Sequence, residues 1–281
     1  MLTSTKELLE AAQKKSYAIG AFNLYNLEGA KAVVNAAEAA KSPAIIQILP
    51  QVFDFGGTPL IKLFLEAADS AKVPMSVHLD HCGDRSIIKT ALEAGVQSIL
   101  ADGSTLSFAE NLAFTREMTL IAHAQGAAVE AEVGRISGTE DGMTVAEKEA
   151  KMTDPEQAEE IVKETGVDFL AVTIGNVHGK YYSEPKLDFP RLAKIRQQIP
   201  IPLVLHGASG LPAAIIQESI ELGVCKFNVN TEVRQQYLQF WREYGQKASQ
   251  PDLLDCQKAL TAAMQEVVAE KMQMFGSAGK A

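Results

Sequence analysis

Ser76-Val77-His78-Leu79-Asp80-His81 is the stretch around which the predicted fold is organised, and it runs into Cys82-Gly83-Asp84. Its alternation of apolar and polar residues predicts a short buried β-strand with reactive side chains at the C-terminal end. Neighbouring residues of a strand point to opposite faces, so Asp80 and His81 can serve one site only where the backbone bends. An ion pair that closes a strand is the simpler alternative for an Asp-His pair considered alone.

Seven other short apolar runs follow the same plan, with helix-like segments between them. The eight predicted strands are residues 18–22, 44–49, 75–79, 98–101, 128–133, 169–174, 203–205 and 226–229, and the helical segments include 28–40, 61–71, 86–94 and 106–125. Eight strand–helix units in 281 residues predict an α/β fold, a closed parallel (β/α)8 TIM barrel. The main alternative is an open doubly wound sheet, but the first strand–helix turn at 23–26 lacks the glycine-rich dinucleotide fingerprint.

Beyond the eighth strand, helical patterns continue at 231–244 and at Leu253–Met274. We therefore expect a single domain over residues 1–281, with a C-terminal helical appendage at about 252–275. Two stretches, 107–110 and 153–156, have the form of capping boxes that begin helices, the second with proline at the first helical position. Glycines that adopt the left-handed conformation are expected to end four helices, at Gly95, Gly126, Gly166 and Gly223.

The composition argues against several classes of partner. The net charge is −9 and no block of basic residues occurs, which argues against a nucleic-acid or anionic-membrane surface. No apolar run reaches the roughly 18 residues that a membrane span needs. The N-terminal residues enter a helical pattern without a signal-peptide core, and the 3 cysteines form no disulfide framework. We expect a soluble cytoplasmic protein.

Three of the 5 histidines fall at the ends of predicted strands. His81, His178 and His206 follow the third, sixth and seventh strands, and in a barrel all such ends surround one cavity. Three imidazoles that converge without a thiolate are typical of a zinc site with an open coordination position. His78 lies within its strand and His123 within a helix, so both are interpreted as hydrogen-bonded structural residues.

Two polar loops follow the seventh and eighth predicted strands. They are His206-Gly207-Ala208-Ser209-Gly210 and Asn228-Val229-Asn230-Thr231. Loops in these positions of a barrel commonly hold phosphate through backbone N–H groups and hydroxyls. An ordinary tight turn is the alternative, but the pair of loops favours a phosphate site.

The ordered motifs together resemble the class II, metal-dependent ketose-bisphosphate aldolases, and most of all the branch of shorter fructose- and tagatose-bisphosphate enzymes. The motifs are His-Leu-Asp-His at 78–81, Asp-Gly-Ser at 102–104, Glu-Ala-Glu-Val-Gly at 130–134, Val-His-Gly at 177–179, His-Gly-Ala-Ser-Gly at 206–210 and Asn-Val-Asn-Thr-Glu at 228–232. The resemblance covers nearly the whole chain, including its ending at 275–280. It implies a lyase that reversibly cleaves a fructose- or tagatose-1,6-bisphosphate type of ketose to dihydroxyacetone phosphate and glyceraldehyde 3-phosphate, through a zinc-stabilised enediolate, as in glycolysis and related carbohydrate metabolism.

The resemblance also implies roles for individual residues. His81, His178 and His206 would bind one zinc ion per subunit, and Asp80 would act as general acid and base at the C4 hydroxyl. Glu140, in the loop at 137–142, would exchange the proton of dihydroxyacetone phosphate, the plain alternative being a solvated loop acid. Carboxylates that would orient ligands or hold an alternative metal position are Asp102 and Glu132. The implied substrate pocket comprises Asn23, Gly179, Gly207, Ala208, Ser209, Asn228, Val229, Asn230 and Thr231.

Relatives of this kind hold a sodium or potassium ion near the phosphate, and they form homodimers or homotetramers. They usually carry an arginine near the start of the C-terminal helix that reaches a neighbouring subunit's site and binds the distal phosphate. The stretch 252–258 has no arginine here, and Lys258 is the nearest candidate. Lysine binds phosphate as a point charge without the bidentate fork, and Asp255 nearby would oppose a dianion.

Three alternatives therefore stay open. The first is the same chemistry on a ketose 1-phosphate that lacks the distal phosphate. The second is a non-catalytic barrel subunit of a partner aldolase, although the metal ligands and Asp80 are all present. The third is a Schiff-base aldolase that uses Lys226, the one lysine on a predicted strand. Cys82 is interpreted as a bystander rather than a fourth metal ligand.

Overall fold

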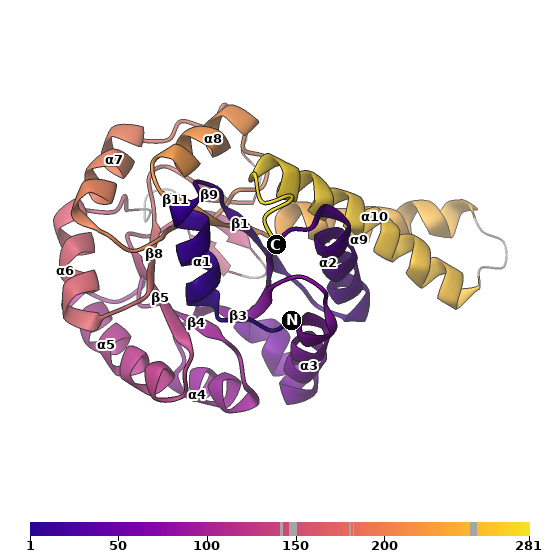
Figure 1. The fold of residues 1–281 in the computed structure, drawn as a ribbon, viewed down its shortest axis with the longest axis horizontal. Coiled ribbons are helices and arrows are strands. Elements are labelled where there is room, and N and C mark those ends of the chain that lie inside the picture. Colours follow the sequence, from indigo (N-terminus) through magenta and orange to yellow (C-terminus); the bar gives the residue numbers. More distant parts are fainter. Residues whose placement is uncertain (141–142, 146–150, 180, 182, 248–251) are drawn as a thin grey trace.

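A closed barrel of eight parallel strands forms the centre of the molecule (Figure 1). The computed structural model describes residues 1–140, 143–145, 151–179, 181, 183–247 and 252–281. The barrel strands are β1 (Ile19–Asn23), β2 (Ala44–Ile48), β3 (Met75–Cys82), β4 (Ser98–Ala101), β5 (Ala128–Val133), β8 (Phe169–Val172), β10 (Leu203–Leu205) and β11 (Val224–Val229). β1 pairs with both β2 and β11, so the sheet has no edge. The predicted barrel is confirmed, and the open sheet is excluded.

Helices surround the barrel because each crossover between parallel strands carries one on the outer face. They are α2 (Leu27–Ala40), α3 (Pro50–Ser70), α4 (Arg85–Ala94), α5 (Phe108–Ala124), α6 (Pro155–Thr165), α7 (Phe189–Gln198) and α8 (Ala213–Glu221). α3 begins at Pro50, earlier than the predicted 61–71. It contains a kink at Gly57, where φ is 60° and ψ is −169°. Gly57 and Pro59 interrupt the periodic pattern there, so the first half of this helix was missed.

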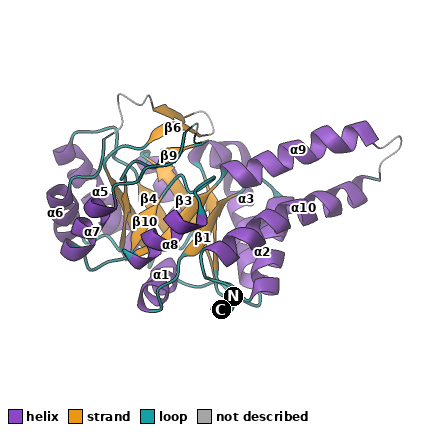
Figure 2. Ribbon diagram, turned by 90° about the horizontal axis from the view of Figure 1, so that it is seen from above, coloured by secondary structure: helices purple, strands orange, loops and turns teal. Residues whose placement is uncertain are grey.

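The N-terminal helix α1 (Thr5–Lys14) closes one end of the barrel. Its Leu8, Leu9 and Ala12 form a buried cluster with interior strand residues such as Ile45 and Phe169. A second and larger core lies outside the strands, between the sheet and the surrounding helices. α1 therefore covers the amino end of the barrel, opposite the carboxyl end (Figure 2).

Two long helices follow β11 and project from the barrel as a hairpin (Figure 1). They are α9 (Thr231–Lys247) and α10 (Leu253–Met274), which match the predicted C-terminal helices. α10 runs back along α2, and the ring of Phe275 stacks on that of Phe227 at a centroid distance of 4.8 Å. Among the described residues, no helix has both the length and the apolar character needed to span a bilayer.

A second small sheet lies over the carboxyl end of the barrel (Figure 2). Its strands β6 (Ser137–Glu140), β7 (Met143–Val145) and β9 (Val177–His178) pair in the order β7-β6-β9. The sequence predicted a loop at 137–142, of which 141–142 lie outside the described residues. A Cβ on Gly138 would lie 2.1 Å from the His178 carbonyl oxygen, so only glycine lets β6 approach β9 this closely.

Most of the predicted helix boundaries are confirmed. Ser107 and Glu110 form the capping box of α5, and the four predicted glycines all have positive φ. The prediction at 153–156 is wrong in one respect: Asp154, not Thr153, caps α6 by accepting from the backbone N–H groups of Glu156 and Gln157. Thr153 instead accepts from the Thr173 N–H at 2.7 Å and donates to the Val133 carbonyl, because it lies between the ends of β5 and β8.

Candidate active site

Asp80 and His81 lie near the C-terminal end of β3, and a bend in the backbone places both in the carboxyl end of the barrel. His81 has a φ of 45°, and the pairing of β3 with β4 shifts register between Leu79 and Cys82. Both residues are buried, with Asp80 1% exposed and His81 7% exposed. A non-glycine residue with positive φ is strained, and such strain is concentrated at functional sites. The sequence predicted that Asp80 and His81 could share one site only if the backbone bends here, and it does.

Three amide groups hold the Asp80 carboxylate. Asn23 Nδ2 donates to Oδ2 at 2.9 Å, Gln47 Nε2 donates to the same oxygen at 3.3 Å, and Asn228 Nδ2 donates to Oδ1 at 3.1 Å. The donors come from β1, β2 and β11, so barrel closure is needed to assemble them. Gln47 was not predicted, although an amide inside the apolar run 44–49 is the signal that could have identified it.

The three predicted metal-binding histidines lie together. His81 comes from β3, His178 from β9 and His206 from the loop after β10. Ring centroids are 4.6 Å apart for His81 and His206, 5.1 Å for His81 and His178, and 6.2 Å for His178 and His206. One nitrogen from each ring lies within 4.8 Å of the others. A single metal ion can therefore contact all three.

Carboxylates orient two of these rings. His81 Nδ1 lies 2.8 Å from Asp102 Oδ2, and His206 Nε2 lies 2.8 Å from Glu130 Oε1. The opposite nitrogens, His81 Nε2 and His206 Nδ1, are buried without a hydrogen-bond partner. Histidine ligands in metal sites commonly donate their second N–H to a carboxylate in this way. Buried nitrogens left without a partner fit a zinc ion, which favours neutral imidazole ligands.

Burial lowers the pKa of His178 and His206 well below the ordinary value of 6.5, and the charge on His81 adds to the effect. Both rings are therefore neutral, which is the form that binds a metal. Burial also lowers the pKa of His81, but the negative charges of Asp80, Asp102 and Glu132 outweigh it and raise that pKa well above 6.5. The site thus attracts positive charge. A bound metal ion would supply this positive charge in place of a proton on His81.

Glu132 and Asp102 form a second group with His81 that could hold a metal ion. Burial, together with the charge of Asp102, raises the pKa of Glu132 to about 8. Burial acts in the same direction on Asp102, but its hydrogen bond to His81 lowers the Asp102 pKa overall. Asp102 thus remains ionised and orients His81, whereas Glu132 Oε2 is buried without a hydrogen bond, 3.7 Å from His81 Nδ1 and 3.8 Å from His206 Nδ1.

The other two histidines are structural, as predicted. Ser98 Oγ lies 2.7 Å from His78 Nδ1, and His123 Nε2 lies 2.8 Å from Asp168 Oδ2. Burial raises the pKa of the Cys82 thiol to about 12, which keeps it protonated. Its Sγ donates to the Asp84 carbonyl at 3.5 Å. Cys82 belongs to none of the metal-ligand groups found among the described residues.

The loops after β10 and β11 lie side by side at the carboxyl end. The Ala208 N–H donates to the Asn228 carbonyl at 3.4 Å, and Tyr181 Oη donates to the Gly207 carbonyl at 2.9 Å. Gly207 has a φ of 65°, and a Cβ there would lie 2.1 Å from the Val177 carbonyl oxygen. Thr231 begins α9 directly after Asn230, so the N-terminus of this helix adjoins the loop, and helix N-termini commonly bind anions. Tyr181 was not predicted, because nothing in its local pattern marks it.

Comparisons with known proteins were made over the whole chain. The model of the family described as class II fructose-bisphosphate aldolase matches residues 3–280. The chain belongs to the class II fructose-bisphosphate aldolase family. Membership implies an aldehyde-lyase on a TIM barrel, in agreement with the fold.

Several solved structures are similar to this member of the aldolase family. A protein of Coccidioides immitis, provisionally assigned as a fructose-1,6-biphosphate aldolase, is 40% identical with a TM-score of 0.93 over 98% of this chain and 97% of that one. The YdjI aldolase of Escherichia coli K12 is 38% identical with a TM-score of 0.89, and the match covers 100% of both chains. The fructose-bisphosphate aldolase of Campylobacter jejuni shares the fold at 22% identity, with a TM-score of 0.82 over 100% of this chain and 97% of that one.

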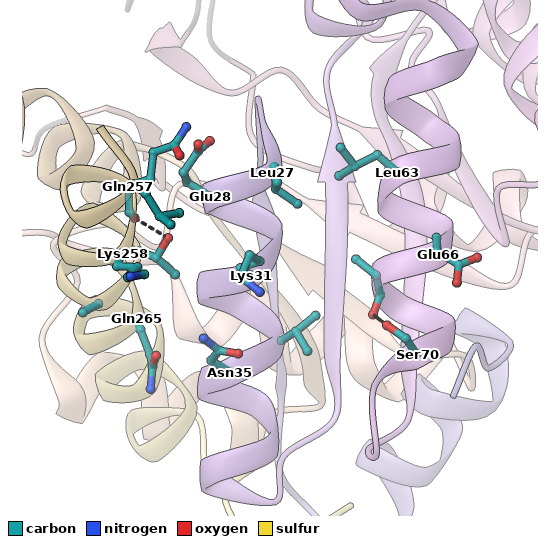
Figure 3. Close-up of a pocket in the computed structure, with 15 residues that line it drawn as sticks. Leu27, Glu28, Lys31, Asn35, Leu63, Glu66, Ser70, Gln257, Lys258 and Gln265 are labelled. Carbon is teal, nitrogen blue, oxygen red and sulfur yellow. Dashed lines mark hydrogen bonds between the residues drawn. The ribbon is translucent and has the colours of Figure 1, made fainter. Parts of the chain in front are cut away.

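Two predicted site residues of the aldolase, Glu140 and Lys258, are not part of this cluster in the described structure. Glu140 ends β6, but its side chain lies outside the described part of the chain. Lys258 is exposed on α10, donates to Asp255 Oδ1 at 3.1 Å, and lines a groove between α10, α2 and α3 (Figure 3). Its contacts within one chain are therefore not with the histidines. Its role toward a distal group of the substrate stays a prediction.

Proposed function

We propose that this protein is a zinc-dependent class II aldolase that reversibly cleaves a ketose phosphate to dihydroxyacetone phosphate and an aldehyde. The observation that carries the proposal is the convergence of His81, His178 and His206 beside Asp80 at one end of the barrel. Family membership supplies the reaction class, and this cluster supplies a site for it.

The three histidines would hold the zinc ion. When bound, the ion would act as a Lewis acid that stabilises the negative charge developing on the ketone fragment as the C3–C4 bond breaks. The protein contributes two oriented imidazoles, because Asp102 and Glu130 each hold the remote nitrogen of one ring at 2.8 Å. Orientation of this kind reduces the entropy lost when the ion binds.

Asp80 would move the proton of the C4 hydroxyl, as general base in cleavage and general acid in condensation. Its two oxygens receive amide donors from Asn23, Gln47 and Asn228, which hold the carboxylate in one orientation. Burial at 1% exposure keeps bulk water away from the group. A positioned proton acceptor typically contributes about 10²- to 10⁴-fold to a rate.

The phosphate of the dihydroxyacetone moiety would lie against the loops after β10 and β11. Ser209 and Thr231 supply hydroxyls, and Gly207 lets the backbone approach closely. Val229 and Ala208, at 0% and 1% exposed, have side chains in the apolar core, so they would offer only backbone groups. N–H groups at the start of α9 give a negative group a favourable field.

A second candidate is the same reaction on a ketose 1-phosphate without a distal phosphate. The observation that favours it is the absence of arginine from 252–258, together with the pairing of Lys258 to Asp255 at 3.1 Å. A Schiff-base mechanism has weaker support, because Lys226 is fully buried and lies 2.8 Å from Glu130 Oε2. An amine held in an ion pair is a poor nucleophile.

The test is release of dihydroxyacetone phosphate from fructose 1,6-bisphosphate, tagatose 1,6-bisphosphate and a panel of ketose 1-phosphates. Each substrate is assayed with zinc-loaded protein, with chelated protein, and after zinc is restored. Activity that disappears on chelation and returns with zinc supports the proposal, and the preferred substrate decides between the two candidates. Full activity in protein shown to be metal-free would overturn the zinc mechanism. Activity with none of the substrates would overturn the assigned reaction.

A further inference from the structure

We propose that Glu130 and Lys226 form a positioning pair that fixes the orientation of His206 for metal binding. The inference rests on the proposed zinc function and deepens it by naming residues that never touch the metal. Glu130 lies on β5 and Lys226 on β11, and both side chains are 0% exposed inside the barrel. Burying two charged groups is costly unless each is fully paired, so packing alone does not account for the presence of Glu130 and Lys226 inside the barrel.

The hydrogen bonds use both oxygens of Glu130 for different partners. Oε1 lies 2.8 Å from His206 Nε2, and Oε2 accepts from Lys226 Nζ at 2.8 Å. A carboxylate can only accept a hydrogen bond, so His206 carries its ring proton on Nε2 and keeps Nδ1 free of hydrogen. His206 Nδ1 is buried without a hydrogen-bond partner, 3.8 Å from Glu132 Oε2, and one nitrogen of this ring lies within 4.8 Å of a nitrogen from each of the other two histidines. The pair thus selects the tautomer that can donate a lone pair to a metal.

Lys226 keeps Glu130 in place for this task. Without its ammonium group, Oε2 would lose its hydrogen bond, since His78 Nε2 lies 3.7 Å away, beyond hydrogen-bond distance. His78 is itself held by Ser98, whose hydroxyl lies 2.7 Å from Thr5 Oγ1 of α1. Polar contacts thus run from Thr5 of α1 through Ser98 to His78 and end there, because His78 Nε2 forms no hydrogen bond. We infer that Lys226, through its hydrogen bond to Oε2, holds Glu130 against displacement and rotation.

Zinc affinity is the measurement that shows whether Glu130 and Lys226 orient His206 or only fill space in the barrel interior. Glu130→Leu combined with Lys226→Met removes both charges while keeping a similar side-chain volume, a change that barrel cores often tolerate. His206 Nε2 then has no acceptor, and we expect zinc to bind about 10- to 100-fold more weakly, as is usual when a partner of a metal ligand is lost. Lys226→Met alone should give a smaller loss in the same direction.

Lys271→Met is the matched control. The Lys271 side chain is 4% exposed and lies 2.8 Å from Glu232 Oε1, whose side chain is 30% exposed, so this variant also breaks a lysine–glutamate pair in which the lysine is buried. It does not contact the histidines, so its zinc affinity should equal that of the unaltered protein while its thermal stability falls. Zinc Kd is measured on folded protein by competition with a chromogenic chelator, and melting temperature is recorded on the metal-free forms.

Each outcome bears on one hypothesis. Weaker zinc binding in the double variant, with unchanged binding in Lys271→Met, supports the positioning pair. Equal zinc Kd in the double variant and in the unaltered protein would overturn it, even if both variants melt at lower temperature. If the double variant does not fold, Lys226→Met decides by the same criterion. Failure of the unaltered protein to bind zinc would instead count against the proposed function.

Discussion

Asp80 and His81 are consecutive residues, yet both side chains lie in one buried site because His81 has a φ of 45°. Asp80 contacts side chains from β1, β2 and β11, whereas His81 contacts Asp102, which follows β4, and the other two histidines. A regular strand would have sent one of the two outward. The bend therefore brings a proton-transfer group and a metal ligand together.

Replacing Asp80 should separate chemistry from metal binding. Asp80→Ala removes the proposed proton acceptor but leaves His81, His178 and His206 unchanged. We expect zinc content near one per chain and a cleavage rate reduced by at least about 10²-fold. Zinc is measured by elemental analysis and the rate by release of dihydroxyacetone phosphate. Loss of zinc together with activity would mean that Asp80 acts through the metal site instead.

His206→Ala should reduce both properties, because it removes one of three proposed ligands and leaves Glu130 without its Oε1 partner. We expect weaker zinc binding and loss of activity in parallel. His123→Ala is a suitable control, since His123 is a helix residue that contacts Asp168. The control should retain zinc and activity. Equal zinc content in His206→Ala and the unaltered protein would contradict the ligand assignment.

A substitution at Gly207 tests whether the proposed phosphate loop must lie close to the Val177 carbonyl. A Cβ there would lie 2.1 Å from the Val177 carbonyl oxygen, so Gly207→Ala forces the backbone to move. Gly126→Ala is matched, because φ there is 75° and no atom lies within 4 Å of the added Cβ. The control should cost about 1 kcal/mol from the unfavourable φ alone. Thermal unfolding should show a clearly larger loss for Gly207→Ala, and comparable losses would contradict the packing argument.

Asp168 should make the fold sensitive to acid. Burial tends to raise its pKa, but hydrogen bonds from Lys6, His123 and the Val129 N–H outweigh burial and lower the pKa below the ordinary value of 3.8. A depressed carboxylate pKa stabilises the folded protein above the ordinary value, and this contribution is lost as pH falls through the lowered value. Asp168→Asn should therefore reduce stability by about 1–3 kcal/mol at pH 7, where buried donors lose a charged acceptor.

The difference between this variant and the unaltered protein should shrink below pH 3.8, where Asp168 becomes protonated when the chain unfolds. Denaturant unfolding at several pH values measures this. A stability difference that stays constant down to the most acidic condition would show that Asp168 does not act through its charge.

Local patterns predicted the barrel strands and most helix boundaries well, because period and capping depend on residues close in sequence. They missed the first half of α3, where Gly57 and Pro59 hide a kinked helix, and the β7-β6-β9 sheet. β6 and β9 pair across intervening chain, with Ser137 opposite Val177, so no local period marks them. Thr153 was misassigned for a similar reason, since its partners Val133 and Thr173 are both remote in sequence.

By itself, the sequence determined the alternation of strands and helices, the residue types at each strand end and hence the class of site, because these depend on local periodicity and side-chain chemistry. Only the tertiary structure decided which of those residues meet. Glu130 and Lys226 are 96 positions apart and become partners only because the barrel brings β5 and β11 to face a common interior. The left-handed backbone at His81 is likewise imposed by the surrounding contacts, since an isolated histidine disfavours it.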